Sequence, residues 1–141
     1  MADREGDALL HTSSFVVLIE DKEFGFAEVG PLTSATDFDA PDKKPAHRLA
    51  PVILRRAVGT STDLYDWRRA IVVGKQDRRD VIVRQLSAPG GRVVNAWRLV
   101  RAWPIRWSGP SFNALHSDVA FEEVELMFDD LLWLPTKDRG G

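Results

Sequence analysis

Apolar and polar positions alternate along much of the chain, and this pattern predicts a succession of short strands. Residues 15–20 (FVVLIE) are β-branched and apolar, and residues 23–29 (EFGFAEV) alternate. With a turn at Asp21-Lys22 between them, the two stretches predict a hairpin that Gly30-Pro31 ends. Further strands are predicted at residues 52–58 (VILRRAV), 80–87 (DVIVRQLS) and 92–107, and within the region 118–133.

One segment has a helical period instead. Its apolar residues fall at i, i+3 and i+7, which places them in one stripe facing a core. The stripe consists of Leu64, Trp67 and Ile71. We therefore predict a helix over residues 62–73, with the hydroxyl of Thr60 or Ser61 accepting a backbone N–H of the first turn as N-cap.

Residues 33–50 (TSATDFDAPDKKPAHRLA) are polar, contain two prolines and have no regular period. A stretch this long without apolar alternation is usually a functional segment or a disordered one. We interpret it as an extended arm or projecting hairpin, and an ordinary flexible loop is the alternative.

The long strand at 92–107 has a break near its end. Simple alternation places Leu99, Arg101 and Trp103 on one face, and Pro104 removes a backbone donor, so that pairing there must be interrupted or lie at an edge. In the region 118–133 the apolar residues change parity. A one-residue slip at Glu122-Glu123, which is the mark of a β-bulge, would bring all of them to one face. These apolar residues are Val119, Phe121, Val124, Leu126 and Phe128.

Six or seven strands with one helix predict a mainly β protein, a small antiparallel β-barrel or sandwich of two packed sheets. The chain has 141 residues, which fits a single domain over 1–141 with flexible ends at about 1–12 and 135–141. An apolar content of 44% excludes a disordered tail. The sequence has no apolar run near 18 residues and starts without a signal-peptide pattern, so we expect no membrane anchor and assembly in the cytoplasm.

The net charge of −2 conceals three blocks of opposite sign. Residues 1–42 hold ten acidic and two basic residues, residues 43–106 hold fifteen basic and four acidic ones, and residues 107–141 hold seven acidic and two basic ones. Two interpretations remain open. Acidic and basic strands pair inside one subunit, or patches of opposite sign on two copies of the chain attract each other.

Catalytic and cofactor motifs are absent from the sequence. The three histidines have no metal-ligand spacing, and there is no cysteine. Gly74-Lys75 lacks the first glycine and the hydroxyl residue of a phosphate-binding loop, and no G-x-S-x-G motif is present. We therefore expect no catalytic residue, no metal and no cofactor. Five tryptophans fit core or subunit-interface positions better than a platform for stacking bases or sugars.

The order of these features resembles the tail tube proteins of contractile phages and phage-like contractile injection systems. The resemblance covers roughly residues 14–134. Its most specific parts are residues 63–69 (DLYDWRR) and residues 102–114 (AWPIRWSGPSFNA) within the segment 97–114, which residues 119–126 (VAFEEVEL) follow. Two departures are the proline- and lysine-bearing arm at 33–50 and Trp133, which has no counterpart in the family pattern.

The resemblance implies a non-enzymatic structural subunit that forms hexameric rings, which stack into a tube with a lumen for cargo protein or DNA. Expected partners are further copies of the chain, a contractile sheath, and baseplate or spike and tube-terminating proteins, in a phage tail or a released injection particle. We expect contacts between subunits at Lys43, Lys44, His47, Arg48, Arg101, Arg106, Glu122, Glu123 and Glu125. The alternatives are a baseplate ring protein that initiates the tube and, more distantly, a small ligand-binding β-barrel.

Overall fold

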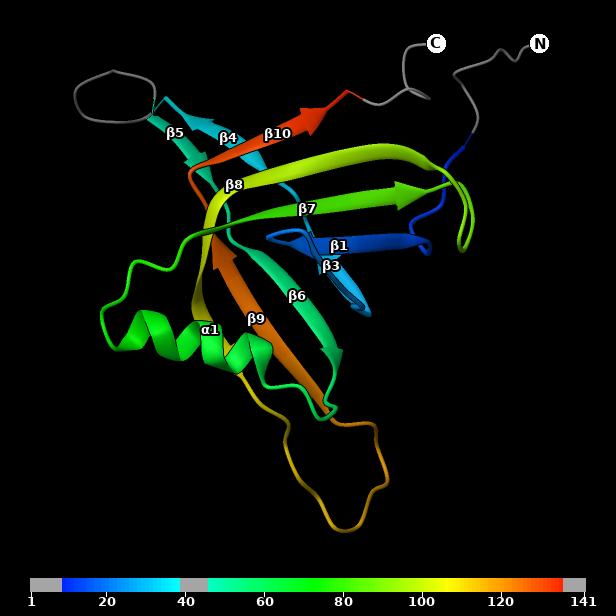
Figure 1. The fold of residues 1–141 in the computed structure, drawn as a ribbon, viewed down its shortest axis with the longest axis vertical. Coiled ribbons are helices and arrows are strands. Elements are labelled where there is room, and N and C mark those ends of the chain that lie inside the picture. The colour runs from blue at the N-terminus through cyan, green and yellow to red at the C-terminus, as the bar shows by residue number, and fades with distance from the viewer. Residues whose placement is uncertain (1–8, 39–45, 136–141) are drawn as a thin grey trace.

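Ten strands and one helix follow one another in the computed structural model, which describes residues 9–38 and 46–135 (Figure 1). The mainly β prediction is confirmed. In chain order the elements are β1 (Phe15–Ile19), β2 (Lys22–Phe24), β3 (Glu28–Gly30), β4 (Ser34–Asp37), β5 (Ala46–Leu49), β6 (Val52–Ala57), α1 (Asp63–Val72), β7 (Arg79–Leu86), β8 (Val93–Ser108), β9 (Phe121–Met127) and β10 (Asp130–Leu134).

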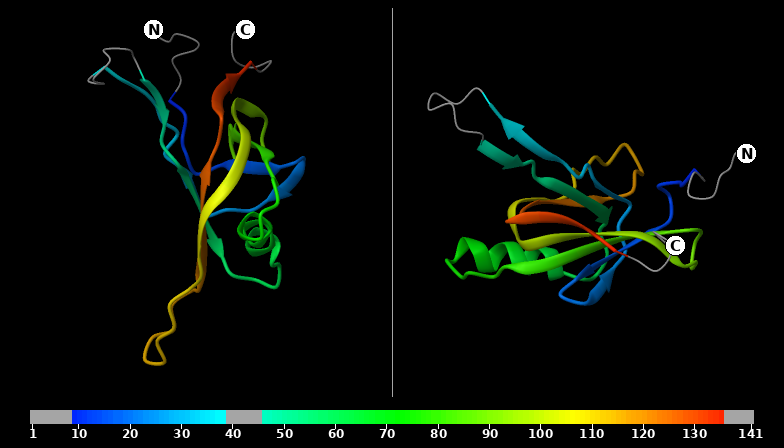
Figure 2. Two further views of the ribbon diagram at one scale, coloured as in Figure 1. Left: turned by 90° about the vertical axis from the view of Figure 1, so that its left-hand side faces the viewer. Right: turned by 90° about the horizontal axis from the view of Figure 1, so that it is seen from above.

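Two antiparallel sheets share the long strand β8. Its first half pairs with β7 and β10, and β7 continues through β1 to β2; we call these strands the first sheet. The second half of β8 pairs with β9, which continues through β6 to β3; these form the second sheet. Figure 2 shows the first sheet and α1 on the same side of the second sheet, which leaves the other side of that sheet open. The sheets pack as a sandwich and do not close into a barrel.

The change of sheet along β8 happens at Arg101. Its φ angle of 53° lies in the left-handed region, which a non-glycine residue adopts at some cost in energy. Because of this bulge, Leu99 and Ala102 are both fully buried while Arg101 is exposed. The backbone N–H of Arg101 donates to the carboxylate of Asp80 at 2.9 Å, which holds the bulge in place. The predicted shared face of Leu99 and Arg101 is therefore wrong.

Strand β9 alternates without a slip, so the predicted bulge at Glu122-Glu123 is wrong. Glu122, Val124 and Leu126 are buried on the inner face, while Phe121 lies on the other face under the guanidinium of Arg55. The irregularity lies in β8 instead, between Pro104 and Arg106. Pro104 is an edge residue there, as predicted: only β9 pairs with this half of β8, and the Pro104 carbonyl accepts a hydrogen bond from Arg68.

The helix prediction is confirmed, with corrections to its ends. Leu64 and Trp67 are buried in the core, and the indole N–H of Trp67 donates to the Asp77 carbonyl at 2.7 Å. Ile71, however, is only half-buried. The N-cap is Thr62 rather than Thr60 or Ser61, although the Ser61 hydroxyl oxygen accepts the N–H of Asp63.

The arm predicted at 33–50 contains a hairpin that projects from the sandwich (Figures 1 and 2). Within the described residues, β4 and β5 pair only with each other, from Ser34 opposite Leu49 to Asp37 opposite Ala46. The described part of the arm thus contains a paired β-hairpin rather than an irregular loop. Lys43 and Lys44 lie outside the described residues. Among the described residues, no helix is long and apolar enough to cross a membrane.

Candidate assembly interface

Several surfaces of the subunit have features that are costly in an isolated monomer. The β4–β5 hairpin is the first of them. An isolated two-stranded ribbon is marginally stable in water. This one carries a Thr36–His47 hydrogen bond of 3.0 Å and an Arg48–Asp37 ion pair of 3.1 Å, and it has Phe38 exposed beside it. Of the sequence-predicted contact residues, His47 and Arg48 therefore lie on a projection.

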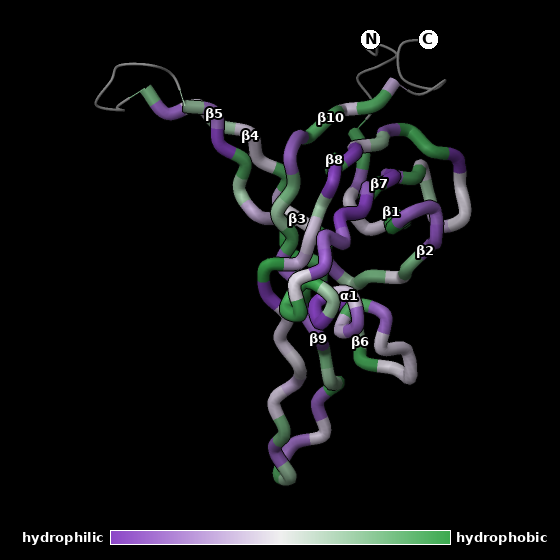
Figure 3. Tube along the Cα trace, turned by 60° about the vertical axis from the view of Figure 1, so that its left-hand side comes forward, coloured by the Kyte–Doolittle hydropathy of each residue, from purple (hydrophilic) through white to green (hydrophobic). Residues whose placement is uncertain are grey.

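The second surface is the loop of residues 109–120, which extends beyond the end of the second sheet (Figure 1). Phe112 is 87% exposed and Leu115 is 89% exposed, and Val119 is also exposed. A local turn shapes the loop. The Asn113 side-chain oxygen accepts a hydrogen bond from the backbone N–H of Leu115, and the Asn113 backbone carbonyl accepts one from the N–H of His116. Figure 3 shows the loop as a narrow extension with apolar positions near its end.

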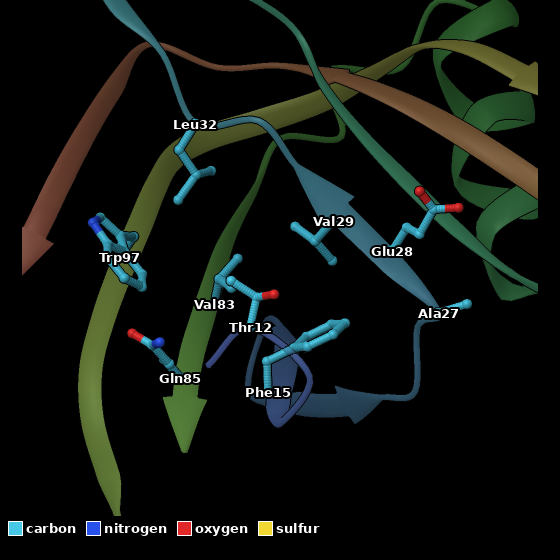
Figure 4. A pocket seen from close by; sticks show the side chains of 9 residues that line it. All are labelled: Thr12, Phe15, Ala27, Glu28, Val29, Leu32, Val83, Gln85 and Trp97. Carbon is cyan, nitrogen blue, oxygen red and sulfur yellow. The ribbon is translucent and has the colours of Figure 1, made fainter. Parts of the chain in front are cut away.

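The third surface is a hollow between the two sheets (Figure 4). It has a volume of about 370 Å³ and a mainly apolar lining. Its lining residues are Thr12, Phe15, Ala27, Glu28, Val29, Leu32, Val83, Gln85 and Trp97. Of these residues, Trp97 packs on Trp133 with ring centroids 5.3 Å apart, and the Trp133 indole donates to the Asn95 side chain at 3.1 Å.

Unpaired sheet edges are the fourth feature. Within the described residues, β2 and β10 end the first sheet, and β3 and the second half of β8 end the second sheet. Edge strands present free backbone donors and acceptors and are templates for pairing with another chain. On β10 this edge also exposes Leu132 and Trp133.

The charged residues predicted as contacts are largely paired within the chain. Arg101 binds Asp129 at 3.0 Å, and Arg106 lies 4.0 Å from Glu125. Arg55 bridges two strands of the second sheet, with Glu28 at 3.0 Å and Glu123 at 3.5 Å. The acidic and basic blocks of the sequence therefore meet in part inside one subunit, which is the first of the two interpretations of the charge pattern.

Glu122, which we expected to contact another subunit, is instead buried inside its own. Its side chain is buried and accepts hydrogen bonds from the Arg56 guanidinium and the Trp107 indole, both at 2.8 Å. The Arg56 guanidinium also lies over the rings of Phe24 and Phe26. Sequence reasoning missed this cluster. An Arg and a Glu at inward positions of neighbouring strands mark it, and they can be matched only when the pairing register of the strands is known.

Two carboxyl groups near the helix have perturbed acidity. Hydrogen bonds from Arg79, at 2.9 Å to each oxygen, lower the pKa of Asp77 below its usual value. A hydrogen bond from Lys22 lowers the pKa of Asp63 in the same way. Both are structural ion pairs. Among the described residues, no group of three or more His, Cys, Asp or Glu side chains could hold a metal ion.

Comparison with known families gives one clear match and one negative result. The model of the T4-like virus tail tube protein gp19 family matches residues 12–132 of the chain. No curated protein matches significantly.

Solved structures share the fold over nearly the whole chain. A protein in the PVC sheath–tube complex of an extracellular contractile injection system, in the extended state, has a TM-score of 0.75 and 21% identity, over 92% of this chain and 94% of that one. A protein in the tube-terminating cap of the anti-feeding prophage has a TM-score of 0.74 and 19% identity, over 96% and 97%. Hcp1 from Flavobacterium johnsoniae has a TM-score of 0.65 and 14% identity, over 85% and 94%.

Proposed function

The chain belongs to the family of the T4-like virus tail tube protein gp19 and is a structural subunit of a tail tube, and we propose that it forms hexameric rings stacked into the inner tube of a contractile injection particle. A family match over residues 12–132 covers the sandwich, the helix and the described part of the arm. The finer proposal concerns ring size, stacking, lumen and partners.

The observation that carries this proposal is the pair of open edges of the second sheet. β3 lies at one edge and the second half of β8 at the other, so that copies placed side by side can pair edge to edge. Such a contact is heterologous, and repeated around an axis it closes into a ring. Closure also removes edges that would otherwise invite uncontrolled pairing.

In this ring, the open face of the second sheet lines the lumen. The face carries Phe121 covered by Arg55, the Arg55–Glu28 and Arg55–Glu123 pairs, and Arg106 near Glu125. Because the charges are paired, the wall is hydrated and has a low net charge, which suits the passage of cargo without strong binding. The proposal includes either a cargo protein or DNA as the molecule that passes through the lumen.

The similar structures support the same partners for this chain. They include a sheath–tube complex, a tube-terminating cap and an anti-feeding prophage baseplate reconstructed with six-fold symmetry. We propose a contractile sheath around the tube, a terminator at one end and a baseplate at the other, in a particle assembled in the cell. In this proposal the role is architectural, without catalysis.

A second candidate is a baseplate ring that initiates the tube. The anti-feeding prophage baseplate contains a protein with a TM-score of 0.74 to this chain and 17% identity, so the fold alone is compatible with both roles. The projecting β4–β5 hairpin favours the tube, because a repeating stack needs an element that reaches the next layer.

Electron microscopy of the purified protein, concentrated without its partners, tests the proposal. We expect tubes of varied length with six-fold rings in cross-section. Single six-fold rings at every concentration would favour the baseplate candidate. Monomers throughout the concentration series would contradict both roles.

A further inference from the structure

The most exposed apolar side chains of the described residues outside the chain ends gather at the tip of the loop of residues 109–120. Phe112 and Leu115 are 87% and 89% exposed; Phe112 precedes the turn that Asn113 closes with two hydrogen bonds, and Leu115 lies within it. The turn presents both side chains outward without help from the rest of the fold. A preformed apolar tip of this kind is unfavourable in water and typical of a contact surface.

Within the part of the chain that the structure describes, this tip has no receptor in its own subunit. The loop joins the end of β8 to the start of β9 and extends away from both sheets, at the bottom of Figure 1. The apolar hollow lies between β1, β3, β7 and the first half of β8, in the upper half of the molecule (Figures 1 and 4). A loop that points away from the hollow can reach it only on another copy.

The hollow has the properties expected of such a receptor. Phe15, Val29, Leu32 and Val83 form its apolar wall, and its volume of about 370 Å³ is in the range of sites that bury small apolar groups. Trp97 lines the hollow and is backed by Trp133, with ring centroids 5.3 Å apart, and tryptophan is enriched where protein interfaces gain most of their binding energy. Gln85, another lining residue, accepts a hydrogen bond from the Asn95 side chain at 3.0 Å, which fixes one polar side chain at the hollow.

We propose that the tip of the loop of residues 109–120, with Phe112 and Leu115, inserts into the hollow lined by Phe15, Val83 and Trp97 on a second copy of this chain. The inference rests on the proposed function, because it supplies one contact of the repeating assembly. Loop and hollow are different surfaces, so the contact is heterologous and repeats head to tail. It adds a specific apolar contact to the edge pairing and the arm.

Cysteine cross-linking tests this contact directly, since the natural chain has no cysteine. Phe112→Cys places a thiol on the tip, and Thr12→Cys places one on the exposed side of the hollow. After mild oxidation or treatment with a short bis-maleimide, the double variant gives a ladder of covalent oligomers. A mixture of the two single variants gives only dimers, because each chain then carries one half of the link.

Two controls keep the result specific. Phe112→Cys combined with Val72→Cys, on the exposed face of α1, gives no ladder. Tubes of the double variant that give no ladder would overturn the inference and leave the proposed function intact. Absence of any assembly from the unmodified protein would instead overturn the proposed function, and this inference with it.

A second variant separates contact from folding. Phe112→Ser with Leu115→Ser leaves the thermal unfolding of the monomer unchanged and lowers tube yield at least ten-fold. Val73→Ser, an exposed apolar residue at the end of α1, is the matched control and retains the yield. Normal tube yield from the loop variant would contradict the inference.

Discussion

Aromatic residues occupy two contrasting regions of this molecule. On the buried face of α1, Trp67 is 1% exposed, packs in the core and donates a hydrogen bond to the Asp77 carbonyl. At the tip of the loop of residues 109–120, Phe112 is 87% exposed. An aromatic side chain thus stabilises the subunit by burial in one place and is exposed to water in the other. The difference fits our proposal that buried aromatic residues such as Trp67 hold the subunit together, whereas Phe112 contacts another copy in the assembly.

The largest effect is expected on the core side of this comparison. Trp67→Ala leaves a large cavity and removes the hydrogen bond to Asp77, which destabilises the subunit by about 3–5 kcal/mol. Urea denaturation of monomer at low concentration measures this loss. Val72→Ala, on the exposed face of the same helix, is the control, with a change of less than about 0.5 kcal/mol. Equal losses from both variants would show that the helix is not anchored by its buried face.

Two adjacent glutamates allow the same comparison, buried against exposed, for charged side chains. Glu122 is 4% exposed and bound by Arg56 and Trp107, whereas Glu123 pairs with Arg55 on the open face of the second sheet. Glu122→Ala leaves the Arg56 charge buried and unpaired, at a cost of about 3 kcal/mol. Glu123→Ala costs less than about 1 kcal/mol, because solvent screens the exposed pair. A reversed order in chemical denaturation would contradict the burial assigned to β9.

The next effect falls on assembly more than on folding. Arg101→Glu removes the ion pair with Asp129 and reverses one charge of the basic block, which costs the monomer about 1 kcal/mol. We expect Arg101→Glu to reduce the yield of tubes, measured by sedimentation, more than it reduces the stability of the monomer. Lys44→Glu, in the arm, is expected to reduce the tube yield as well. If both variants form tubes at the normal yield, charge attraction between copies does not drive stacking.

The smallest effect concerns acid stability. Arg79 lowers the pKa of Asp77, so the stabilisation from this pair is complete above the usual carboxyl pKa and is lost as the pH falls through the lowered value. Asp77→Asn therefore lowers stability at pH 7 by less than about 1 kcal/mol, because the pair is partly solvated. The difference from the natural protein shrinks in urea denaturation as the pH falls below the usual carboxyl pKa, because the Asp77 carboxylate is then protonated. A difference that persists there would assign the effect to lost packing or hydrogen bonds.

Much of the fold follows from local patterns, and the errors follow from what those patterns omit. The period of Leu64 and Trp67 predicts the helix because burial selects one face. Alternation fails at Arg101, because a residue in the left-handed region reverses the side to which later residues point. In β9 alternation holds, and the error was to assume that every apolar residue faces the core: Glu122 lies on the buried face and Phe121 on the other.

The candidate interface was predictable only in outline. The arm and the basic block are visible in composition, but the sequence does not tell that Arg101 and Arg106 lie near Asp129 and Glu125 of the same chain. Nor does it reveal the hollow, because this forms from β1, β3, β7 and β8, which are distant along the chain. Exposure of Phe112 likewise becomes evident only when the ends of the neighbouring strands are known.

A cryo-electron microscopy reconstruction of the assembly formed by the purified protein tests the central claim most directly. We predict a helical stack of six-fold rings in which the sandwich is unchanged, the open face of the second sheet lines the lumen, and both the β4–β5 hairpin and the loop of residues 109–120 contact other copies. An assembly in which both projections remain in solvent, or one in which the core strands rearrange, would contradict the account.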